Sequence, residues 1–218
     1  MTDDSREFPE PGFAGEPAVA VTDSSDAMER RILATAAALF RTKGYAQSTT
    51  RELAGMIGLK KASLYHYVQS KEDLLYEISI ESLQQIDGDV AAAIADSAPG
   101  SVLRDLIKAH ICSALGNRDH HAVMLSELRS LSEPRQQQVV KARDAYEARV
   151  RGVITREQTE SRLRSDINPK YLTLSLLNLL NWTIFWYQPG GPMEPEQLAQ
   201  LLASVFIEGA GTPSAATQ

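Results

Sequence analysis

The chain has 218 residues, 43% of them hydrophobic, and it carries a formal net charge of −6 and a single cysteine, Cys112. This length and apolar content allow two packed domains and exclude a wholly disordered chain. One cysteine excludes an internal disulfide and suits a reducing compartment, and the most apolar stretch, 172–187, is too short and too polar for a membrane span. A soluble, cytoplasmic protein is therefore expected.

The charge is distributed unevenly along the chain. Residues 28–71 hold eight basic and two acidic side chains, whereas 1–27 and 72–218 each sum to −6. Only the first of these regions is electrostatically suited to nucleic acid. The Pro- and Gly-rich segment 1–25 is acidic, so it predicts a disordered arm rather than one that enters a DNA groove, and 212–218 predicts a disordered tail.

Three helices are predicted in the basic region. Periodic apolar residues place the first over 26–43. Thr49 and Glu52 have the spacing of a capping box, so a second helix begins next to them. Gly58 can adopt the positive φ that ends a helix, and a third short helix follows over 61–68. Two short helices joined by a glycine turn are typical of a helix-turn-helix.

The third helix combines basic, hydroxyl and aromatic side chains on its polar side. Lysines on a helix are often merely solvated, and a tyrosine is often half-buried packing. Here, however, basic residues bracket one short helix, and Ser70 starts a second capping motif whose free amides suit a phosphate. This conjunction favours DNA. The candidate DNA-contacting residues are Thr49, Thr50, Arg51, Lys60, Lys61, Ala62, Ser63, Tyr65, His66, Tyr67 and Lys71.

The order of these motifs (ALFRTKGY, the helix-turn-helix, LYHYV and SKEDLL) resembles the DNA-binding domain of TetR/AcrR-type bacterial transcription regulators over about residues 28–75. Two positions depart from the family pattern: Lys60 replaces a frequent Ser or Thr cap, and Val68 replaces a frequent Phe. The resemblance implies a DNA-binding domain over 26–72 and a homodimer that reads a palindromic operator. It also implies a protein of the bacterial cytoplasm that associates with the nucleoid through its operator.

The rest of the chain also predicts helices, with no strand periodicity and no internal repeat. The fold class expected is all-α, about nine helices in all, with the helix-turn-helix domain followed by a larger ligand-binding and dimerisation domain over 73–211. In the TetR family the fourth helix links the two domains, and the same role is implied here. Most breaks coincide with proline or glycine, and the predicted helices span 71–95, 101–116, 119–131, 134–160, 169–187 and 195–209.

The last two predicted helices suggest a dimer. The helix over 169–187 is apolar nearly all round, which predicts burial on two opposite sides, and 195–209 has one apolar stripe. The family resemblance implies that this pair meets its symmetry mates in a four-helix interface; a thick monomeric core is the alternative. The candidate interface residues are Leu172, Leu176, Leu179, Thr183, Trp186, Leu198, Leu201, Leu202, Val205 and Phe206.

The helices of the larger domain contain few polar groups suited to its interior. An apolar pocket with a few such groups is the usual form of a small-molecule site. Each histidine suits a surface or satisfied core position better than a ligand contact, and Arg129 could pair with Glu133 instead. The candidate ligand-binding residues are Leu106, His110, Met124, Glu127, Leu128, Arg129, Tyr146, Asn178, Asn181, Trp182 and Phe185.

The segment 186–192, WYQPGGP, resembles the end of TetR-family regulators that control lipid, fatty-acid or sterol degradation, some of which respond to acyl-CoA thioesters. This resemblance implies a small hydrophobic effector, with an acyl-CoA as the candidate and Arg129 meeting its phosphate or carboxylate. The alternative is a regulator of drug efflux with an aromatic or cationic ligand. Ligand-controlled repression is the expected mechanism, through a tilt of the fourth helix that changes the spacing of the recognition helices.

An enzyme is the competing class. The chain has no HExxH, GxSxG, phosphate loop or paired cysteines, so neither catalysis nor a cofactor is predicted. A metal site built from His110, His120 and Glu127 remains as the alternative. A purely structural helical adaptor, the third class, would not explain why basic residues concentrate in one helix-turn-helix.

Overall fold

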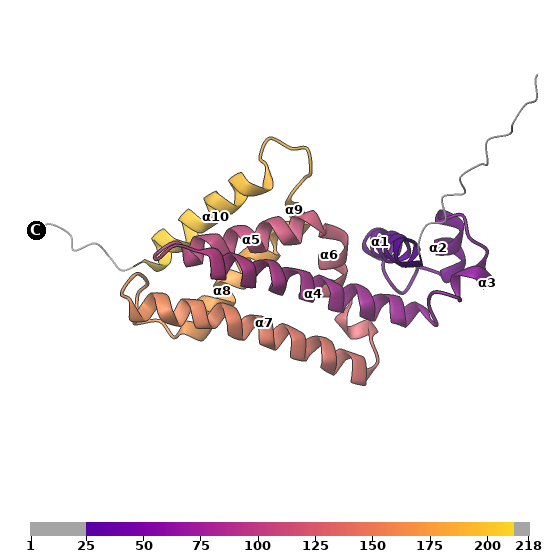
Figure 1. Cartoon of the computed structure of the whole chain (residues 1–218), viewed down its shortest axis with the longest axis horizontal. Helices are drawn as coiled ribbons and strands as arrows, with labels where there is room; N and C mark the ends of the chain where they lie inside the picture. Colours follow the sequence, from indigo (N-terminus) through magenta and orange to yellow (C-terminus); the bar gives the residue numbers. More distant parts are fainter. Residues whose placement is uncertain (1–24, 212–218) are drawn as a thin grey trace, which may run out of the picture.

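The computed structural model describes residues 25–211, and these residues are helical apart from short connections and one isolated bridge pair, Leu163 with Gly211 (Figure 1). The predicted all-α fold class is confirmed. The segments predicted to be disordered, 1–25 and 212–218, lie outside the described residues except for Ser25, which begins the first helix. None of the described helices is both long and apolar enough to cross a membrane.

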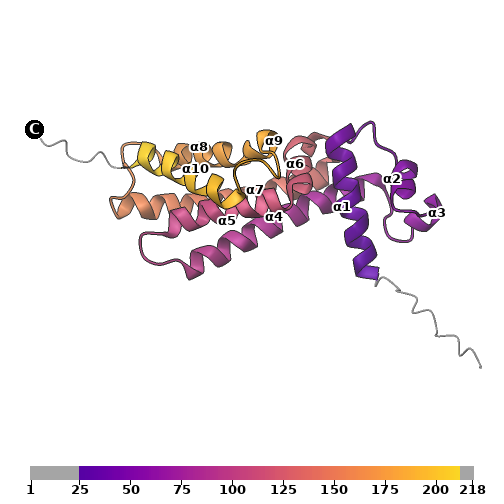
Figure 2. The same cartoon turned by 90° about the horizontal axis from the view of Figure 1, so that it is seen from above.

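Three helices form the helix-turn-helix unit, the predicted DNA-binding unit, at one end of the molecule (Figure 2). They are α1 (Ser25–Lys43), α2 (Thr50–Met56) and α3 (Lys61–Leu64). α3 is shorter than the predicted 61–68, because the amides of His66 and Tyr67 bond three residues back, to Ser63 and Leu64, and tighten the chain into a turn. The buried residues that hold the unit together include Ile32, Ala36, Phe40, Leu53, Ala54 and Leu64.

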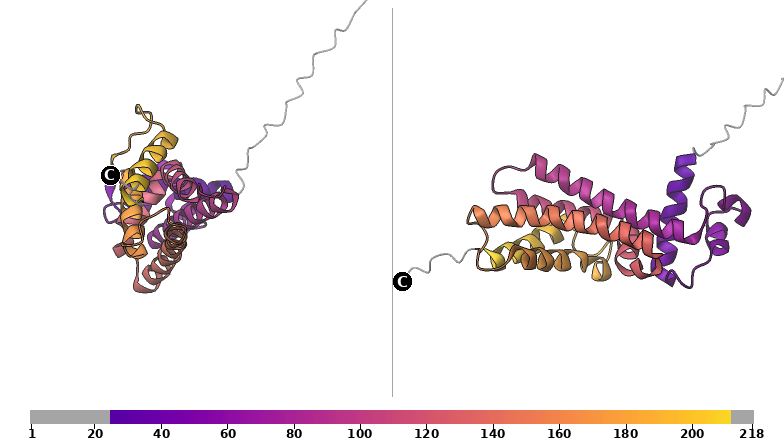
Figure 3. Two further views of the ribbon diagram at one scale, coloured as in Figure 1. Left: turned by 90° about the vertical axis from the view of Figure 1, so that its left-hand side faces the viewer. Right: turned by 90° about the horizontal axis from the view of Figure 1, so that it is seen from below.

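The larger domain is a bundle arranged around one long helix, α4 (Lys71–Asp96). α4 starts in the DNA-binding unit and runs the length of the bundle, with α7 beside it (Figures 1 and 3). The bundle contains α5 (Val102–Gly116), α6 (Arg118–Ser126), the 3-10 turn η1 (Leu128–Ser130), α7 (Glu133–Thr159), α8 (Pro169–Asn181), α9 (Thr183–Trp186) and α10 (Pro195–Ala210).

Two helices predicted as continuous are broken. The predicted 119–131 ends at Ser126 and resumes as η1, and the predicted 169–187 is interrupted at Trp182. The Thr183 hydroxyl donates to the Leu180 carbonyl at 2.7 Å, so that carbonyl is satisfied where the regular helix stops.

Hydrophobic packing is continuous from the DNA-binding unit into the bundle. Val123 and Met124 of α6 and Val139 of α7 belong to the same buried cluster as the α1–α3 core and the first half of α4. A second cluster joins the other half of α4 to α5, α8 and α10. A displacement of α6 or α7 therefore acts directly on the packing that supports the DNA-binding unit.

Candidate DNA-binding surface and effector pocket

The start of α2 and the turn after it form as predicted, with one difference. Thr49 Oγ1 accepts the amide of Glu52 at 3.2 Å, which caps the helix, and Gly58 has a φ of 75°. The reciprocal half of the capping box is absent, because the Glu52 carboxylate pairs instead with Lys43 at 2.6 Å. This ion pair ties α2 to the end of α1.

Most of the predicted DNA-contacting residues lie on one exposed surface formed by the start of α2 and by α3. The Thr50 and Tyr65 hydroxyls lie 3.3 Å apart, and the Lys61 ammonium is 5.7 Å from the centre of the Tyr65 ring. Tyr65 therefore links the two helices and sits beside a cation. Thr50 and Ser63 are half-buried, and the exposed members of the set are Thr49, Arg51, Lys60, Lys61, Ala62, Tyr65, His66 and Tyr67.

Lys71 is placed differently from the expectation. Its ammonium donates to the carbonyls of Tyr45 (2.8 Å) and Ser48 (3.0 Å) and lies 4.1 Å from the centre of the Tyr45 ring. Two of its three donors are therefore occupied inside the protein. This geometry gives Lys71 a role in holding the loop between α1 and α2, and its predicted DNA contact stays a prediction.

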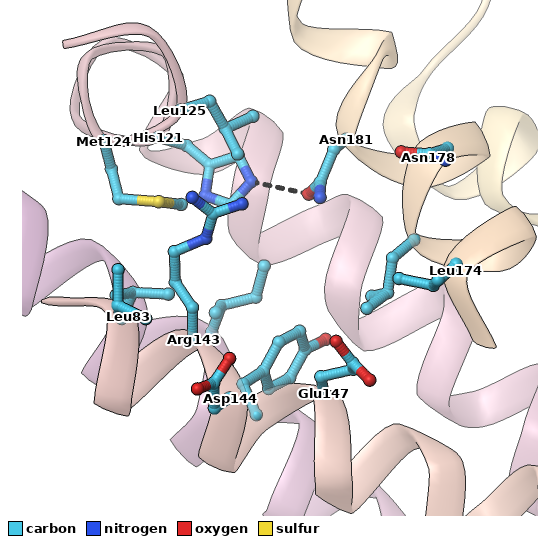
Figure 4. A pocket seen from close by; sticks show the side chains of 14 residues that line it. Leu83, His121, Met124, Leu125, Arg143, Asp144, Glu147, Leu174, Asn178 and Asn181 are labelled. Atoms are coloured by element: carbon cyan, nitrogen blue, oxygen red, sulfur yellow. Dashed lines mark hydrogen bonds between the residues drawn. The ribbon is translucent and has the colours of Figure 1, made fainter. Parts of the chain in front are cut away.

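A cavity of about 330 Å³ lies in the bundle between α4, α6, α7 and α8 (Figure 4). Its walls combine aliphatic side chains with a few polar and charged ones. The residues that line it are Leu83, Ile86, His121, Met124, Leu125, Val140, Arg143, Asp144, Tyr146, Glu147, Leu174, Leu177, Asn178 and Asn181.

His121 is the central polar group of this cavity. Its Nδ1 lies 3.1 Å from Ser82 Oγ, and its Nε2 lies 3.1 Å from Asn181 Oδ1 (Figure 4). Burial, together with the nearby charge of Arg143, lowers the pKa of His121 to about 4 despite the hydrogen bond to Asn181. The ring is therefore neutral at pH 7; Nε2–H donates to Asn181, and the Ser82 hydroxyl donates to Nδ1.

A second polar pair lies behind the cavity wall. His110 Nδ1 and the Tyr146 hydroxyl are 2.6 Å apart. Burial and the neighbouring His121 lower the pKa of His110 to about 3, and burial raises the pKa of Tyr146. His110 Nε2 has no hydrogen-bond partner among the described residues, although Asn181 is close enough to influence its pKa. The polar side chains in and behind the interior of the cavity are thus uncharged.

Charged side chains of α7 surround the cavity mouth. Arg143 and Asp144 are exposed, and Glu147 pairs with Arg151 at 3.1 Å. Figure 4 shows the Arg143 guanidinium beside the His121 ring, and no ion pair within residues 25–211 neutralises it. The mouth therefore offers one unpaired cation next to two carboxylates.

The cavity contains four of the predicted ligand-binding residues: Met124, Tyr146, Asn178 and Asn181. Of the others, Leu106 is buried in the core, and His110 lies behind Tyr146. Leu128 and Arg129 lie on η1, outside the cavity, and Trp182 and Phe185 face solvent. Glu127 accepts the Tyr45 amide at 3.3 Å, so it joins α6 to the DNA-binding unit instead.

Four of the ten cavity residues outside the predicted set come from α7, and three of these four are charged. Arg143, Asp144 and Glu147 belong to a strongly charged stretch that is typical of a solvated helix face. Only the packing of α7 against α4 and α8 brings them to a cavity. The feature that comes nearest to indicating these cavity residues is the group of buried polar residues around His121.

The predicted dimer residues are divided between the interior and the surface. Leu172, Leu176, Thr183, Leu198, Leu202 and Phe206 are buried in the protomer's own core, so they have little surface to offer a second copy. Leu179 is half-buried. Trp186, Leu201 and Val205 are exposed, and the other large exposed apolar side chains of α8, of the break after it and of α9 are Tyr171, Trp182 and Phe185.

No group of three or more His, Cys, Asp or Glu side chains within the described residues is arranged to hold a metal ion. Two residues of the alternative metal site have other partners. His110 pairs with Tyr146, and Glu127 accepts the Tyr45 amide.

A helix-turn-helix unit joined by a long helix to a helical domain with an internal pocket defines the class of one-component transcription regulators. The family described as "Bacterial regulatory proteins, tetR family" matches residues 32–78, and "Tetracyclin repressor-like, C-terminal domain" matches 96–210. The chain belongs to the TetR family of DNA-binding transcription regulators, which confirms the resemblance seen in its motifs.

Three relatives illustrate the likeness. The chain is 28% identical over 194 residues to the HTH-type transcriptional repressor KstR2 of Mycolicibacterium smegmatis, covering 86% of this chain and 93% of that one. The TetR-family regulator PfmR from Thermus thermophilus superposes with a TM-score of 0.76 at 32% identity, covering 82% and 97%. AibR, solved in complex with isovaleryl coenzyme A and operator DNA, gives 0.73 at 25%, covering 81% and 96%.

Proposed function

We propose that this protein is a dimeric repressor that binds a palindromic operator and releases it when a small hydrophobic effector enters the cavity between α4, α6, α7 and α8. The observation that carries this proposal is the position of the cavity. α4 forms one of its walls and begins at Lys71, shortly after α3 ends at Leu64. A ligand at Leu83 or Ile86 therefore acts on the helix that holds the recognition element.

The DNA-binding part of the proposal rests on charge and shape. Residues 28–71 have a net charge of +6 in an otherwise acidic chain, and α3 presents Lys61 and Tyr65 outward. One such helix reads too few base pairs for specificity. Two helices related by a twofold axis would read half-sites about one DNA turn, roughly 34 Å, apart.

The dimer would form through the outward faces of α8, α9 and α10. Tyr171 and Trp182 are 64% and 63% exposed, and Leu201 and Val205 on α10 are 48% and 56% exposed. The Trp182 and Phe185 rings lie 4.9 Å apart, so they form one aromatic surface. Apolar side chains gathered in this way on a protein surface usually mark an interface.

The effector class follows from the size and polarity of the cavity. A volume of about 330 Å³ is at the small end of ligand sites, so it suits an acyl chain or a ring rather than a whole coenzyme A. The neutral His121 and Asn181 pair can hydrogen-bond a carbonyl, and Arg143 at the mouth suits an anionic group. We therefore favour an acyl-CoA thioester whose acyl group is buried and whose nucleotide part remains outside.

A cationic or aromatic ligand is the second candidate. The observation in its favour is the presence of Asp144 and Glu147 beside Arg143 at the same mouth. This ligand class would be typical of a regulator of drug efflux, the alternative drawn from the sequence.

Release would follow from differential binding of the effector to two arrangements of the bundle. α6 contributes His121 and Met124 to the cavity and is tied to α1 by the Arg41–Asp119 ion pair at 2.5 Å. A coupling free energy of about 1–3 kcal/mol between effector and operator would lower operator affinity about 5- to 150-fold. The protein would act at operators in the bacterial cytoplasm.

The proposal can be tested by selecting operator duplexes from random DNA with the full-length protein. We expect a palindromic site and, with about eight phosphate contacts per dimer, a slope of log K against log salt near −7. Isovaleryl-CoA, longer acyl-CoAs, free fatty acids and tetraphenylphosphonium are then titrated against the complex, with coenzyme A alone as the control. Acyl-CoA should raise the operator Kd and coenzyme A should not; release by the phosphonium cation instead would favour the second candidate. Failure to select any sequence would refute the proposed function.

A further inference from the structure

Two arginine–aspartate ion pairs join α4 to α7, and they are equally spaced on both helices. The proximal pair, Asp73 with Arg135, lies next to the DNA-binding unit, and the distal pair, Asp87 with Arg149, lies 14 residues further along each chain segment. Fourteen residues are about four turns, or roughly 21 Å, of α-helix. Because the spacing is equal on both helices, the two pairs specify the same register of α4 against α7. The two helices run in the same direction.

The effector cavity lies between these two pairs. Its α4 residues, Leu83 and Ile86, fall between Asp73 and Asp87. Its α7 residues, within 140–147, fall between Arg135 and Arg149. A ligand that widens the cavity by moving α7 against α4 therefore acts between two points of attachment, and such a displacement strains one or both of them.

The two pairs differ in how completely they are made. The distal pair is bidentate, with Arg149 Nε 2.6 Å from Asp87 Oδ1 and Nη2 3.0 Å from Oδ2. The proximal pair uses only Arg135 Nη2 and Asp73 Oδ1, and the buried Nη1 and Oδ2 atoms have no hydrogen-bond partner among the described residues. A shift of α7 that brought these two atoms together would complete a bidentate pair. The proximal pair therefore has a second arrangement available, whereas the distal pair is already satisfied.

Asp73 of the proximal pair lies in the first turn of α4, the helix that follows α3. The Asp73 amide donates to Ser70 Oγ at 3.0 Å, which caps α4 directly after the recognition segment. The neighbouring Glu72 accepts the Ser132 amide at 2.8 Å, and the Arg135 guanidinium lies 5.3 Å from the centre of the Tyr76 ring. The first turn of α4 is thus held by the first turn of α7 through several contacts, with Arg135 at their centre.

Burial alone would raise the pKa of Asp73, but hydrogen bonds from Arg135 and Ser70 outweigh it and lower that pKa. The pair therefore keeps both charges at pH 7. It acts as a strong, directional contact at the point where the DNA-binding unit joins the bundle.

We propose that Arg135 is a positioning residue for the recognition helix: through Asp73 it transmits the position of α7 to α3, while the distal pair only maintains the helix register. This inference rests on the proposed function, because it concerns the regulation of the same DNA-binding surface. Loss of Arg135 should therefore change operator binding and the mobility of 61–70, whereas loss of Arg149 should change neither.

The test compares Arg135→Gln with its matched control Arg149→Gln in the full-length protein. On an operator duplex selected by the unmodified protein, we expect Arg135→Gln to change the Kd about 10-fold and Arg149→Gln to change it less than about 3-fold. Hydrogen exchange of the amides of 61–70, measured without DNA, should be faster in Arg135→Gln alone. Arg135→Lys should restore both readouts, because the proximal pair uses a single nitrogen. Asp73→Asn replaces Arg135→Gln if that variant does not fold.

Equal effects of Arg135→Gln and Arg149→Gln on operator Kd and on exchange would show that both pairs are only structural and would overturn the inference. An Arg135→Gln variant with the operator Kd and the exchange of the unmodified protein would overturn it too. If the unmodified protein selects no operator, the proposed function fails, and the exchange of 61–70 still decides whether Arg135 positions that segment.

Discussion

Two lysines near the recognition helix show how surroundings determine what a charge does. Lys61 and Lys71 both fit a DNA-binding pattern in sequence, ten residues apart. The Lys61 ammonium lies beside the Tyr65 ring on the exposed surface, whereas Lys71 donates to two backbone carbonyls of the loop between α1 and α2. One is available to a phosphate, and the other stabilises the fold that presents it.

Substituting Lys61 and Lys71 separately provides a matched experiment. Lys61→Gln should weaken operator binding and reduce the steepness of the salt dependence by about 2, since a dimer loses two phosphate contacts. Lys71→Gln should instead lower the free energy of unfolding by about 2 kcal/mol, because hydrogen bonds from a charged group are lost. Fluorescence anisotropy on operator DNA and urea unfolding measure the two effects. Unfolding of Lys71→Gln at the urea concentration of the parent protein would contradict the assignment.

Buried neutral histidines make stability depend on pH. His121 has a folded-state pKa of about 4 and His110 of about 3, both below the ordinary histidine value of 6.5. Between these values the unfolded chain binds protons that the folded chain does not, so stability is lost as pH falls from about 6.5 towards 4 and is regained as pH rises.

We expect His121→Gln to reduce this dependence by about 1.4 kcal/mol per pH unit below pH 6, because one titrating group is removed. Urea unfolding at pH 7.0, 6.0 and 5.0 provides the slopes for the parent and the variant. Glutamine keeps a donor and an acceptor for Ser82 and Asn181. Identical slopes in the two proteins would mean that His121 is protonated in the folded state.

Individual helices begin and end where local chemistry allows. Ser70 and Thr49 cap α4 and α2, and Gly58 supplies the backbone conformation between α2 and α3. Gly88 lies in the middle of α4, where a side chain would fit, since no neighbouring atom lies within 4 Å of the position that a Cβ would occupy. The same residue type is therefore required at one position and dispensable at the other.

Gly58→Ala should destabilise the protein by about 1–2 kcal/mol, because a side chain is unfavourable at a φ of 75°. Gly88→Ala should stabilise it by about 0.5–1 kcal/mol, because alanine favours the helix more than glycine does. Thermal and urea unfolding of both variants measure the difference in sign. Destabilisation of Gly88→Ala would indicate that α4 needs flexibility next to Asp87.

At the scale of the whole molecule, one basic end is combined with an acidic remainder. Only 28–71 attracts DNA, so the net attraction of a single protomer is small. A dimer would double the basic surface and so compensate for the small attraction of one protomer, provided that the exposed side chains of α8, α9 and α10 associate.

Leu201→Glu with Val205→Glu should therefore yield a folded monomer whose operator Kd rises at least about 100-fold, since two linked sites become one. Gln200→Glu, an exposed change on the same helix, is the control and should remain dimeric. Sedimentation velocity and operator titration provide the two measurements. A dimeric double variant would place the interface elsewhere.

Helix positions, the helix-turn-helix and the family follow from the sequence by itself, because capping residues, glycines and apolar periodicity act within a few turns of the chain. Most predicted helix ends agree with the structure within about two residues. The exceptions at Trp182, at Ser126 and after Leu64 are places where packing or turn contacts override local preference.

Tertiary structure alone decided which sides of α8 face the core, the cavity and the solvent. A helix that is apolar all round has no periodic phase from which its faces could be assigned. The same reason explains why the sequence does not show that Leu172 and Leu176 are buried in the protomer's own core. The sequence does not indicate Arg143 as a pocket residue, because a charged helix face gives no sign of which helices will pack against it. The sequence does not reveal the two Arg–Asp pairs either, because their equal spacing is significant only when α4 and α7 lie side by side.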